Sequence, residues 1–376
     1  MDSVTILQQL IRLKSLTPND AGCMEYIESL LKPLGFRFYY FDRNNTRNMY
    51  AEIGEGDTNF CFAGHTDVVP VGDETSWKYP PFEGVIDNGR IYGRGTSDMK
   101  GGIAAFIAAV LRLKSMPKKG KISLLLTSDE EGPALDGIQY ALPLLEEKGL
   151  IPTLCLVGEP TNPSNHMGGF IKVGRRASFN AKVKIKGTMG HVAYPESAKN
   201  PHIPLVDFLK IITSHVFDEG TDVFSPTNLE VTNINSHNGA TNVIPESVEV
   251  AFNIRFNTLH TKESLKFFID ETIESLKFKL SGYNFEYSIS CDSNADYCSD
   301  PTLIRYLEES VMEILGFMPI STTKGATSDA RFIQKYCPVV EFGLLTDQAH
   351  QIDEWVDLKS LKSLEDIYYL FLQKLF

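Results

Sequence analysis

Carboxylate and imidazole side chains follow the ends of several short apolar runs in this chain. Such runs are typical of buried strands, and open α/β sheets bind their ligands at the carboxyl ends of the strands. Groups placed by chance would lie at both ends of a sheet, so their recurrence after successive runs indicates one shared site. The groups are His65 and Asp67 after residues 59–63, Asp129, Glu130 and Glu131 after residues 121–127, and Glu159 after residues 154–157.

Two further candidates come from loops. Asp98 precedes an apolar helix expected over residues 103–113, and His350 follows a strand expected over residues 339–343. Two imidazoles with several carboxylates match the nitrogen and oxygen ligands of zinc, manganese or cobalt. Three carboxylates and two imidazoles suffice for two metal ions if one carboxylate bridges them. A two-metal site can produce hydroxide near neutral pH and polarise a carbonyl group.

Neighbouring residues can divide this chemistry between them. The side chains of Glu130 and Glu131 diverge at a strand end, so one can reach a given metal ion while the other acts as a base. His65 and Asp67 are two residues apart and point the same way in an extended chain, as a metal ligand or a catalytic dyad requires. Taken singly, each residue has a simpler explanation, such as a solvated acidic turn or a hydrogen-bonded core histidine. The set as a whole favours a site.

The elements that must position these groups divide into two parts. Residues 1–176 and 292–376 alternate apolar strands with amphipathic helices, so we expect an α/β domain with a mixed sheet there. Residues 177–291 begin with a run in which apolar and polar side chains alternate, typical of a half-exposed antiparallel strand. Their order of elements is βαββαβ, a ferredoxin-like α+β arrangement. We interpret this part as a domain inserted into the first.

The composition limits the partners. The chain has 376 residues, 43% of them apolar, and a formal net charge of -12. Nucleic-acid binding needs a basic face, so this charge argues against a nucleic-acid partner and against anionic membranes. The six cysteines form no CxxC pair, as expected in a reducing compartment. Neither a secretory signal nor a membrane-spanning stretch is visible, so we expect a cytoplasmic protein.

Taken in order, the motifs around these residues resemble the zinc aminoacylase/carboxypeptidase (M20) family of dinuclear metallohydrolases, and the resemblance covers the whole chain. It implies a catalytic domain of zinc-peptidase type that binds two Zn²⁺ ions per subunit, for which Co²⁺ or Mn²⁺ can substitute. The matching segments are Gly64-His65-Thr66-Asp67-Val68-Val69-Pro70, Gly93-Arg94-Gly95-Thr96-Ser97-Asp98-Met99-Lys100-Gly101, Asp129-Glu130-Glu131-Gly132, Gly158-Glu159-Pro160 and His350.

The resemblance also assigns roles. Asp98 would bridge the two metal ions, Glu130 would be the general base, and Asp67 would orient His65, as metal-bound imidazoles generally require. His191 in the inserted domain would reach the active site of the partner subunit and stabilise the oxyanion, which implies a homodimer through that domain. The other ligands would be His65 and Glu159 for one metal ion, and Glu131 and His350 for the other.

Further segments within the family pattern imply one activity. It is hydrolysis of the amide bond of N-succinyl-LL-2,6-diaminopimelate to succinate and LL-2,6-diaminopimelate, a step of diaminopimelate and lysine biosynthesis. This small-molecule substrate carries several carboxylates, so cationic and hydroxyl side chains must bind it despite the acidic chain. The expected substrate-binding residues are Arg175, Tyr194, Asn242, Arg255, Gly325 and Thr327.

Two other functions remain open from the sequence. A sibling metallo-amidohydrolase, such as an acetylornithine deacetylase or a dipeptidase, would share the metal ligands and differ around Arg175 and Thr327. A non-catalytic binding protein of the same fold would need no base, so the intact Glu130 argues against it.

Overall fold

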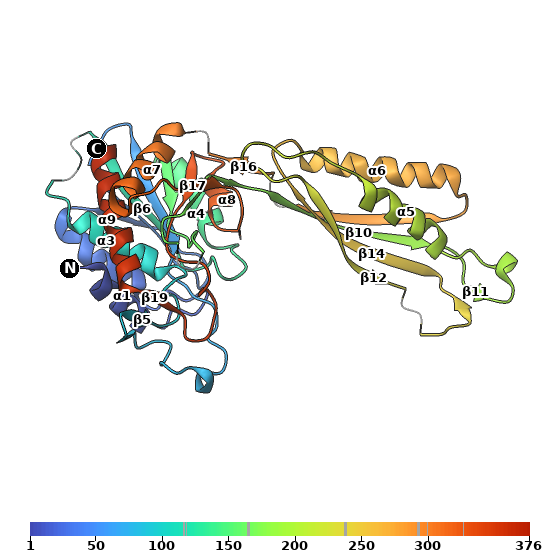
Figure 1. The fold of residues 1–376 in the computed structure, drawn as a ribbon, viewed down its shortest axis with the longest axis horizontal. Coiled ribbons are helices and arrows are strands. Elements are labelled where there is room, and N and C mark those ends of the chain that lie inside the picture. Colours follow the sequence, from blue (N-terminus) through green and yellow to red (C-terminus); the bar gives the residue numbers. More distant parts are fainter. Residues whose placement is uncertain are drawn as a thin grey trace. The chain divides into compact units, whose positions relative to one another are not determined.

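The chain forms two compact units in the computed structural model, shown in Figure 1. Unit 1 comprises Met1–Gly174 and Cys298–Phe376, and unit 2 comprises Arg175–Tyr297. The division expected from the sequence, at 176/177 and 291/292, stays a prediction, and its residue 292 lies outside the described residues. The structure describes residues 1–115, 117, 119–163, 166–236, 239–291, 294–298, 300–325 and 327–376.

An eight-stranded mixed sheet forms the centre of unit 1. In spatial order its strands are β1 (Arg37–Tyr40), β2 (Asn48–Glu55), β6 (Gly120–Thr127), β3 (Asn59–His65), β7 (Leu154–Val157), β18 (Val339–Glu341), β8 (Phe170–Lys172) and β17 (Ile320–Thr322). The strands β6, β3, β7 and β18 run parallel to one another. Their carboxyl ends therefore meet at one edge of the sheet.

Helices cover both faces of this sheet. In β3, Phe60 and Phe62 belong to the core on one face, and Cys61 and Ala63 belong to the core on the other. Because both faces are buried, groups at the strand ends can meet a ligand only at the edge. The first face is covered by α1 (Ser3–Arg12), α2 (Cys23–Leu31), α3 (Lys100–Leu111), α7 (Pro301–Leu315) and α9 (Leu358–Leu375), and the second by α4 (Ile138–Glu147) and α8 (Ala330–Ile333).

A small sheet joins two distant loops of unit 1. Its strands are β4 (Val85–Asp87), β5 (Arg90–Tyr92) and β19 (Trp355–Asp357), in the order β19-β5-β4. Tyr92 lies opposite Trp355 in this sheet, so the segment before Asp98 is paired with the segment after His350. Two short 3-10 helices, η1 (Lys32–Leu34) and η2 (Glu74–Ser76), complete the unit.

Unit 2 is a four-stranded antiparallel sheet whose two helices lie on the same face (Figure 1). Along the chain its elements are β10 (Ala177–Lys186), α5 (His202–Ser214), β12 (Asn228–Asn235), β14 (Ser247–Phe256), α6 (Lys262–Lys279) and β15 (Asn284–Ser290), with the sheet order β12-β14-β10-β15. This is the predicted βαββαβ arrangement, and the prediction of an α/β protein with a mixed sheet and a ferredoxin-like part is confirmed. The shorter elements are β11 (Gly190–His191), η3 (Pro195–Ser197) and β13 (Val243–Ile244), and β9 (Gly174–Arg175) pairs with β16 (Asp296–Tyr297).

Two glycines bring α3 close to the strand ends. We expected them to form a turn before a helix that starts at residue 103, but the helix begins at Lys100 and contains both. A Cβ atom on Gly101 would lie 2.3 Å from the carbonyl oxygen of Thr96, and one on Gly102 would lie 2.4 Å from that of Gly158. Close packing therefore requires glycine here. It sets the first turn of α3 directly against the backbone that precedes Glu159.

Within the described residues, no helix is long and apolar enough to cross a membrane. The cytoplasmic location expected from the sequence stays a prediction.

Replacing Gly102 by alanine tests this packing. The added methyl group must push α3 away from β7, so Gly102→Ala should lower the free energy of unfolding by about 1–3 kcal/mol. Urea denaturation followed by circular dichroism measures the change. Gly239→Ala is the control, because no heavy atom of the described residues lies within 4 Å of the added Cβ there, and a surface change of this kind stays within about 0.5 kcal/mol. Equal stability of the two variants would contradict the packing argument.

Candidate metal centre

The parallel strands bring the predicted acids and imidazoles of unit 1 to one edge. His65 is the last residue of β3, and it lies opposite Thr127, the last residue of β6. Ala63 of β3 lies opposite Val157, the last residue of β7. Because these strands end in register, the residues that follow them are neighbours in space. These residues include Asp67, Glu130, Glu131 and Glu159.

Asp98 lies between the two imidazoles. Its Oδ1 atom is 3.2 Å from Nε2 of His65, and its Oδ2 atom is 3.4 Å from Nε2 of His350. One carboxylate thus presents a different oxygen to each of two histidines. This is the arrangement that a carboxylate bridging two metal ions requires.

The other acids surround this central group. Glu159 Oε1 lies 3.6 Å from His65 Nε2, and Glu131 Oε1 lies 2.9 Å from His350 Nε2. Two sets of ligand atoms lie within 4.8 Å of one another, namely His65, Glu130 and Glu159, and His65, Asp98 and Glu131. The second set places Glu131 with His65, whereas the family pattern places it with His350. The assignment of each ligand to one metal ion stays a prediction.

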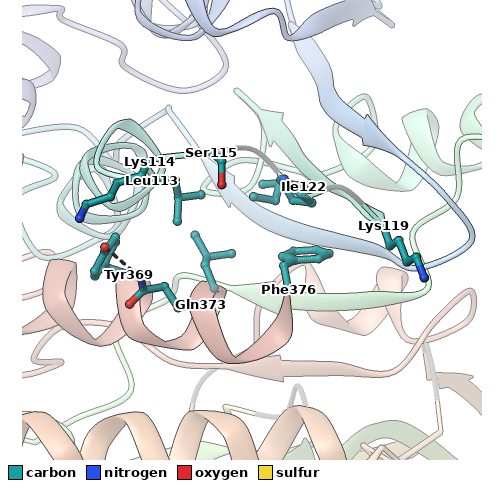
Figure 2. A pocket seen from close by; sticks show the side chains of 10 residues that line it. Leu113, Lys114, Ser115, Lys119, Ile122, Tyr369, Gln373 and Phe376 are labelled. Atoms are coloured by element: carbon teal, nitrogen blue, oxygen red, sulfur yellow. Dashed lines mark hydrogen bonds between the residues drawn. The ribbon is translucent and has the colours of Figure 1, made fainter.

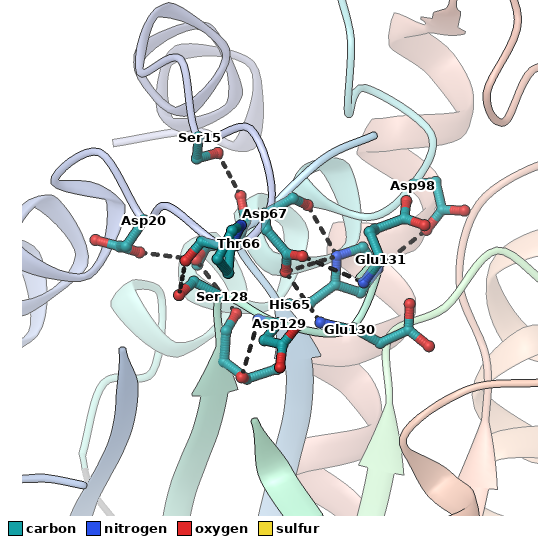
Figure 3. A network of polar contacts seen from close by, with 12 residues as sticks. Ser15, Asp20, His65, Thr66, Asp67, Asp98, Ser128, Asp129, Glu130 and Glu131 are labelled. Carbon is teal, nitrogen blue, oxygen red and sulfur yellow. Dashed lines mark hydrogen bonds and ion pairs between the residues drawn. The ribbon is translucent and has the colours of Figure 1, made fainter. Parts of the chain in front are cut away.

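Asp67 contacts both His65 and the turn that carries Glu130 and Glu131, as Figure 3 shows. Nδ1 of His65 lies 2.9 Å from the main-chain carbonyl oxygen of Asp67 and 3.7 Å from its carboxylate. The carboxylate instead accepts hydrogen bonds from the backbone N–H groups of Glu130, at 3.4 Å, and Glu131, at 3.2 Å. The main chain of Asp67 therefore contacts the imidazole, while its side chain holds the turn that presents the two glutamates. The sequence predicts that Asp67 orients His65, and this role stays a prediction.

Neighbouring carboxylates make both imidazoles easier to protonate. Burial alone would lower the pKa of His65, but the hydrogen bond to Asp98 and the charge of Glu159 raise it well above its usual value. Hydrogen bonds to Asp98 and Glu131 raise the pKa of His350 to about 10. Without a metal ion, both imidazoles are therefore cations at neutral pH.

The acids respond in two ways. Burial would raise the pKa of Asp98, but hydrogen bonds from His350 and His65 hold it well below its usual value. Burial raises the pKa of Glu130 to about 8, and burial together with the charge of Asp98 raises that of Glu159 well above its usual range. Among the described residues, neighbouring acids contribute to the raised pKa values of Glu130 and Glu159, which indicates an excess of negative charge here. A cation would relieve this excess, and the imidazole nitrogen and carboxylate oxygen donors suit zinc, cobalt or manganese.

The cluster opens into a cavity of about 360 Å³. The predicted residues Gly325 and Thr327 line it, and so does Lys172, to which the sequence analysis gave no role. Lys172 Nζ lies 2.6 Å from Glu341 Oε2, and the Ser328 hydroxyl donates to Glu341 Oε1 at 2.9 Å. The sequence could have indicated a buried cation at this position, because Lys172 lies in the apolar strand β8. Its partner could not be inferred, because that partner is 169 residues away in the chain.

The remaining predicted residues belong to unit 2, where one group lies at the start of β10. Arg175 precedes β10, is buried, and its Nε atom lies 3.7 Å from Asp296 Oδ1. Arg255 lies on β14 opposite Ser178, the second residue of β10. These two arginines therefore lie near the same end of the sheet.

A second group lies beyond the other end of β10. His191 on β11 pairs with Val243 on β13, and the backbone N–H of Val192 donates to the carbonyl oxygen of Asn242 at 3.2 Å. The backbone N–H of Tyr194 donates to the carbonyl oxygen of His191 at 2.9 Å, and both side chains are exposed. At about 3.3 Å per residue, the length of β10 separates this group from the arginines by about 26 Å.

Another cavity, shown in Figure 2, is larger but lacks this chemistry. It measures about 500 Å³ and contains no histidine or acid among its lining residues. They are Leu113, Lys114, Ser115, Pro117, Lys119, Ile122, Tyr369, Leu372, Gln373 and Phe376. Cavity size is thus a poorer guide to the site here than the convergence of ionisable groups.

The chain is similar to known proteins over nearly its whole length. A family model described as peptidase family M20/M25/M40 matches residues 61–374. A succinyl-diaminopimelate desuccinylase from Parvibaculum lavamentivorans is 43% identical over 374 residues, which cover 98% of this chain and 94% of the relative. A protein of the same name from Rickettsia bellii is 45% identical over 378 residues, which cover 98% of this chain and 96% of the relative.

Solved structures show the same fold at low sequence identity. The aminopeptidase PepT from Bacillus cereus has a TM-score of 0.77 at 16% identity, covering 99% of this chain and 97% of the other. The M20 family metallo-carboxypeptidase Sso-CP2 from Sulfolobus solfataricus has a TM-score of 0.71 at 17% identity, covering all of both chains. At such identities the likeness concerns the fold alone.

The protonated imidazoles predict that metal binding releases protons. Protein stripped of metal should release protons when Zn²⁺ binds at pH 7, because a coordinating imidazole must be neutral and a coordinating carboxylate must be ionised. Isothermal titration calorimetry in buffers with different ionisation enthalpies measures the number of protons released. His350→Ala should reduce it by about one, since its pKa of about 10 makes it a proton carrier at that pH. A binding enthalpy that is independent of the buffer would contradict the charge states described above.

Proposed function

The chain belongs to peptidase family M20/M25/M40, and on that basis we propose that it is a metal-dependent amidohydrolase that cleaves N-succinyl-LL-2,6-diaminopimelate. The products are succinate and LL-2,6-diaminopimelate, in diaminopimelate and lysine biosynthesis. One observation carries the substrate assignment: relatives named succinyl-diaminopimelate desuccinylase are 42–45% identical over nearly the full length. This similarity favours the desuccinylase over the deacetylase and dipeptidase siblings, and the intact site favours an enzyme over a binding protein.

The residues at the sheet edge support a hydrolytic mechanism. Two Zn²⁺ ions, when bound, would lower the pKa of a water molecule and polarise the amide carbonyl. Asp98 would bridge them, with His65, Glu131, Glu159 and His350 as the other ligands. The structure brings these five side chains together within unit 1.

Glu130 is the proposed general base. It lines the same cavity as the proposed ligands, and a carboxylate oxygen of Glu130 lies within 4.8 Å of ligand atoms of His65 and Glu159. It takes a proton from the attacking water as the oxygen adds to the succinyl carbonyl carbon. It then gives that proton to the amine nitrogen as the C–N bond breaks.

The carboxylates of the substrate need cationic and hydroxyl partners. Gly325, Thr327 and Lys172 line the cavity beside the cluster, so this wall can receive one carboxylate. Arg175 follows Lys172 by three residues in the chain and is the proposed partner for another. Lys172 adds to the expected set, which included no residue of β8.

Activity measurements test this function directly. Zinc-loaded protein should hydrolyse N-succinyl-LL-2,6-diaminopimelate, and removal of the metal with a chelator should abolish turnover until zinc is restored. Glu130→Gln should lower kcat by about 10²–10⁴-fold, the usual contribution of a general base, while zinc content stays at the wild-type level. N-acetylornithine is the control substrate. A preference for it would overturn the substrate assignment and leave the metal site standing.

We also propose that the active unit is a homodimer. The two groups of predicted residues in unit 2 lie at opposite ends of one sheet, about 26 Å apart, so a small substrate cannot contact both in the same copy. Arg175 is close in the chain to the metal cavity, whereas His191 lies beyond the far end of β10. A second copy must therefore supply His191, Tyr194 and Asn242 if all of the predicted residues bind one substrate.

The terminal strand of the sheet in unit 2 has the properties of an interface. β12 is the terminal strand of its sheet, so one side of it has no partner strand in the described part of the chain. Ile234 on β12 is exposed, as are Ile203 and Val206 on α5, the helix that packs beside β12. An exposed edge strand with apolar neighbours is prone to pair with another chain. Two copies joined along β12 would share a continuous sheet.

Mixing two inactive variants tests the dimer. His191→Ala and Glu130→Ala should each be inactive alone, because each lacks one part of every site. If His191 acts across the interface, refolding an equal mixture restores roughly a quarter of wild-type activity: half of the dimers are mixed, and each mixed dimer has one complete site. Light scattering coupled to gel filtration checks the mass. No recovery from a mixture shown to contain mixed dimers would exclude the exchange of His191 between subunits.

A further inference from the structure

A buried ion pair in unit 1 contacts the main chain of two of the proposed metal ligands. Arg94 Nη1 is 2.8 Å from Glu354 Oε2, and the two side chains are 3% and 0% exposed. Arg94 lies in the loop before Asp98, and Glu354 follows His350 by four residues. The pair therefore connects the two loops that supply the bridging carboxylate and one of the imidazoles.

Glu354 fixes the loop that ends at Asp98. Its Oε1 atom accepts the backbone N–H groups of Ser97, at 2.8 Å, and Asp98, at 3.2 Å. Its Oε2 atom accepts the backbone N–H of Gly95 at 3.1 Å. Three N–H groups of one short loop thus point to a single carboxylate, which sets the main-chain position from which Asp98 reaches the two histidines.

Arg94 fixes the loop that carries His350. Its Nη2 atom donates to the carbonyl oxygen of His350 at 3.4 Å, and Nη1 donates to that of Gln351 at 3.0 Å. His350 has a φ of 64°, a left-handed conformation that costs free energy in residues other than glycine unless the surroundings hold it. Its side chain is 51% exposed, so packing alone does not hold the ring. The main chain therefore contributes to the position of the imidazole, together with the contacts of the ring with Glu131 and Asp98.

We propose that Arg94 and Glu354 are positioning residues that set the separation of Asp98 from His350, and thereby the affinity of the metal position that these two share. This inference rests on the proposed metal-dependent function. The pair does not contact substrate, because both side chains are buried and Glu354 already accepts four hydrogen bonds. Each partner holds a different loop. Arg94 holds the loop of His350, which serves one metal position, whereas Glu354 holds the loop of Asp98, which serves both.

Two substitutions and one matched control test this role. Glu354→Gln places an amide N–H group where a carboxylate oxygen accepts hydrogen bonds, and Arg94→Lys keeps the charge but loses the forked geometry. Glu365→Gln is the control, because Glu365 is also a buried acid paired with an arginine, Arg112, at 2.8 Å. That pair joins α3 to α9 and contacts none of the proposed ligands.

Metal binding to protein stripped of metal is the principal readout. Zinc titration by calorimetry should show the position that includes His350 weakened about 10–100-fold in Arg94→Lys and both positions weakened in Glu354→Gln, the usual effect of losing support behind a metal ligand. The visible absorption of the Co²⁺-loaded variants should change only for the positions that are weakened. Glu365→Gln should lose stability but bind both ions as the wild type does.

The outcomes separate this inference from the proposed function. Wild-type zinc affinity at both positions in either variant would overturn the inference and leave the function intact. Equal weakening in Glu365→Gln would also overturn it, because general destabilisation would then explain the loss. If Glu354→Gln fails to fold by circular dichroism, Arg94→Lys decides by the same criteria. A wild-type protein that binds no metal would remove both the inference and the proposed function.

Discussion

The proposed metal site of unit 1 requires that several carboxylates lie close together where the parallel strands of the sheet end. Asp98, Glu130 and Glu159 converge on His65 there. Removing a single carboxylate from water costs several kcal/mol, and neighbouring like charges add to that cost. The two imidazoles offset part of this negative charge. The part that they do not offset contributes to the raised pKa values of Glu130 and Glu159. The same imbalance that penalises this edge makes it favourable for a divalent cation.

The scaffold keeps these charges together by fixing main chains rather than side chains. Parallel strands end in register at His65 and Thr127, and glycine at position 102 lets α3 approach the backbone before Glu159. The Asp67 carboxylate accepts two consecutive N–H groups of the glutamate turn. The segments that supply the ligands thus hold one another through strand pairing and hydrogen bonds to the main chain. The loops can therefore keep their positions despite the repulsion between the acids.

The sequence could predict the fold class and the members of the cluster for a physical reason. Strand ends and alternating patterns are local features, and acids placed after successive strands share an edge whenever those strands are parallel. Pairings between distant segments are not local. Glu354 meets Arg94 across 260 residues, and Lys172 meets Glu341 across 169. Likewise, the sequence could not show that the main chain of Asp67, not its carboxylate, is nearer to His65.

The two imidazoles differ in a way that bears on how the centre works. His65 is 1% exposed and held by β3, whereas His350 is 51% exposed and lies on a left-handed residue of a loop. A ligand of the first kind is fixed by the fold of the sheet. His350 is held by contacts of its main chain and by its ring contacts with Glu131 and Asp98, but not by burial in the core, so it can move at lower cost. The metal position that includes His350 should therefore exchange its ion more readily, although both positions share the same bridging carboxylate.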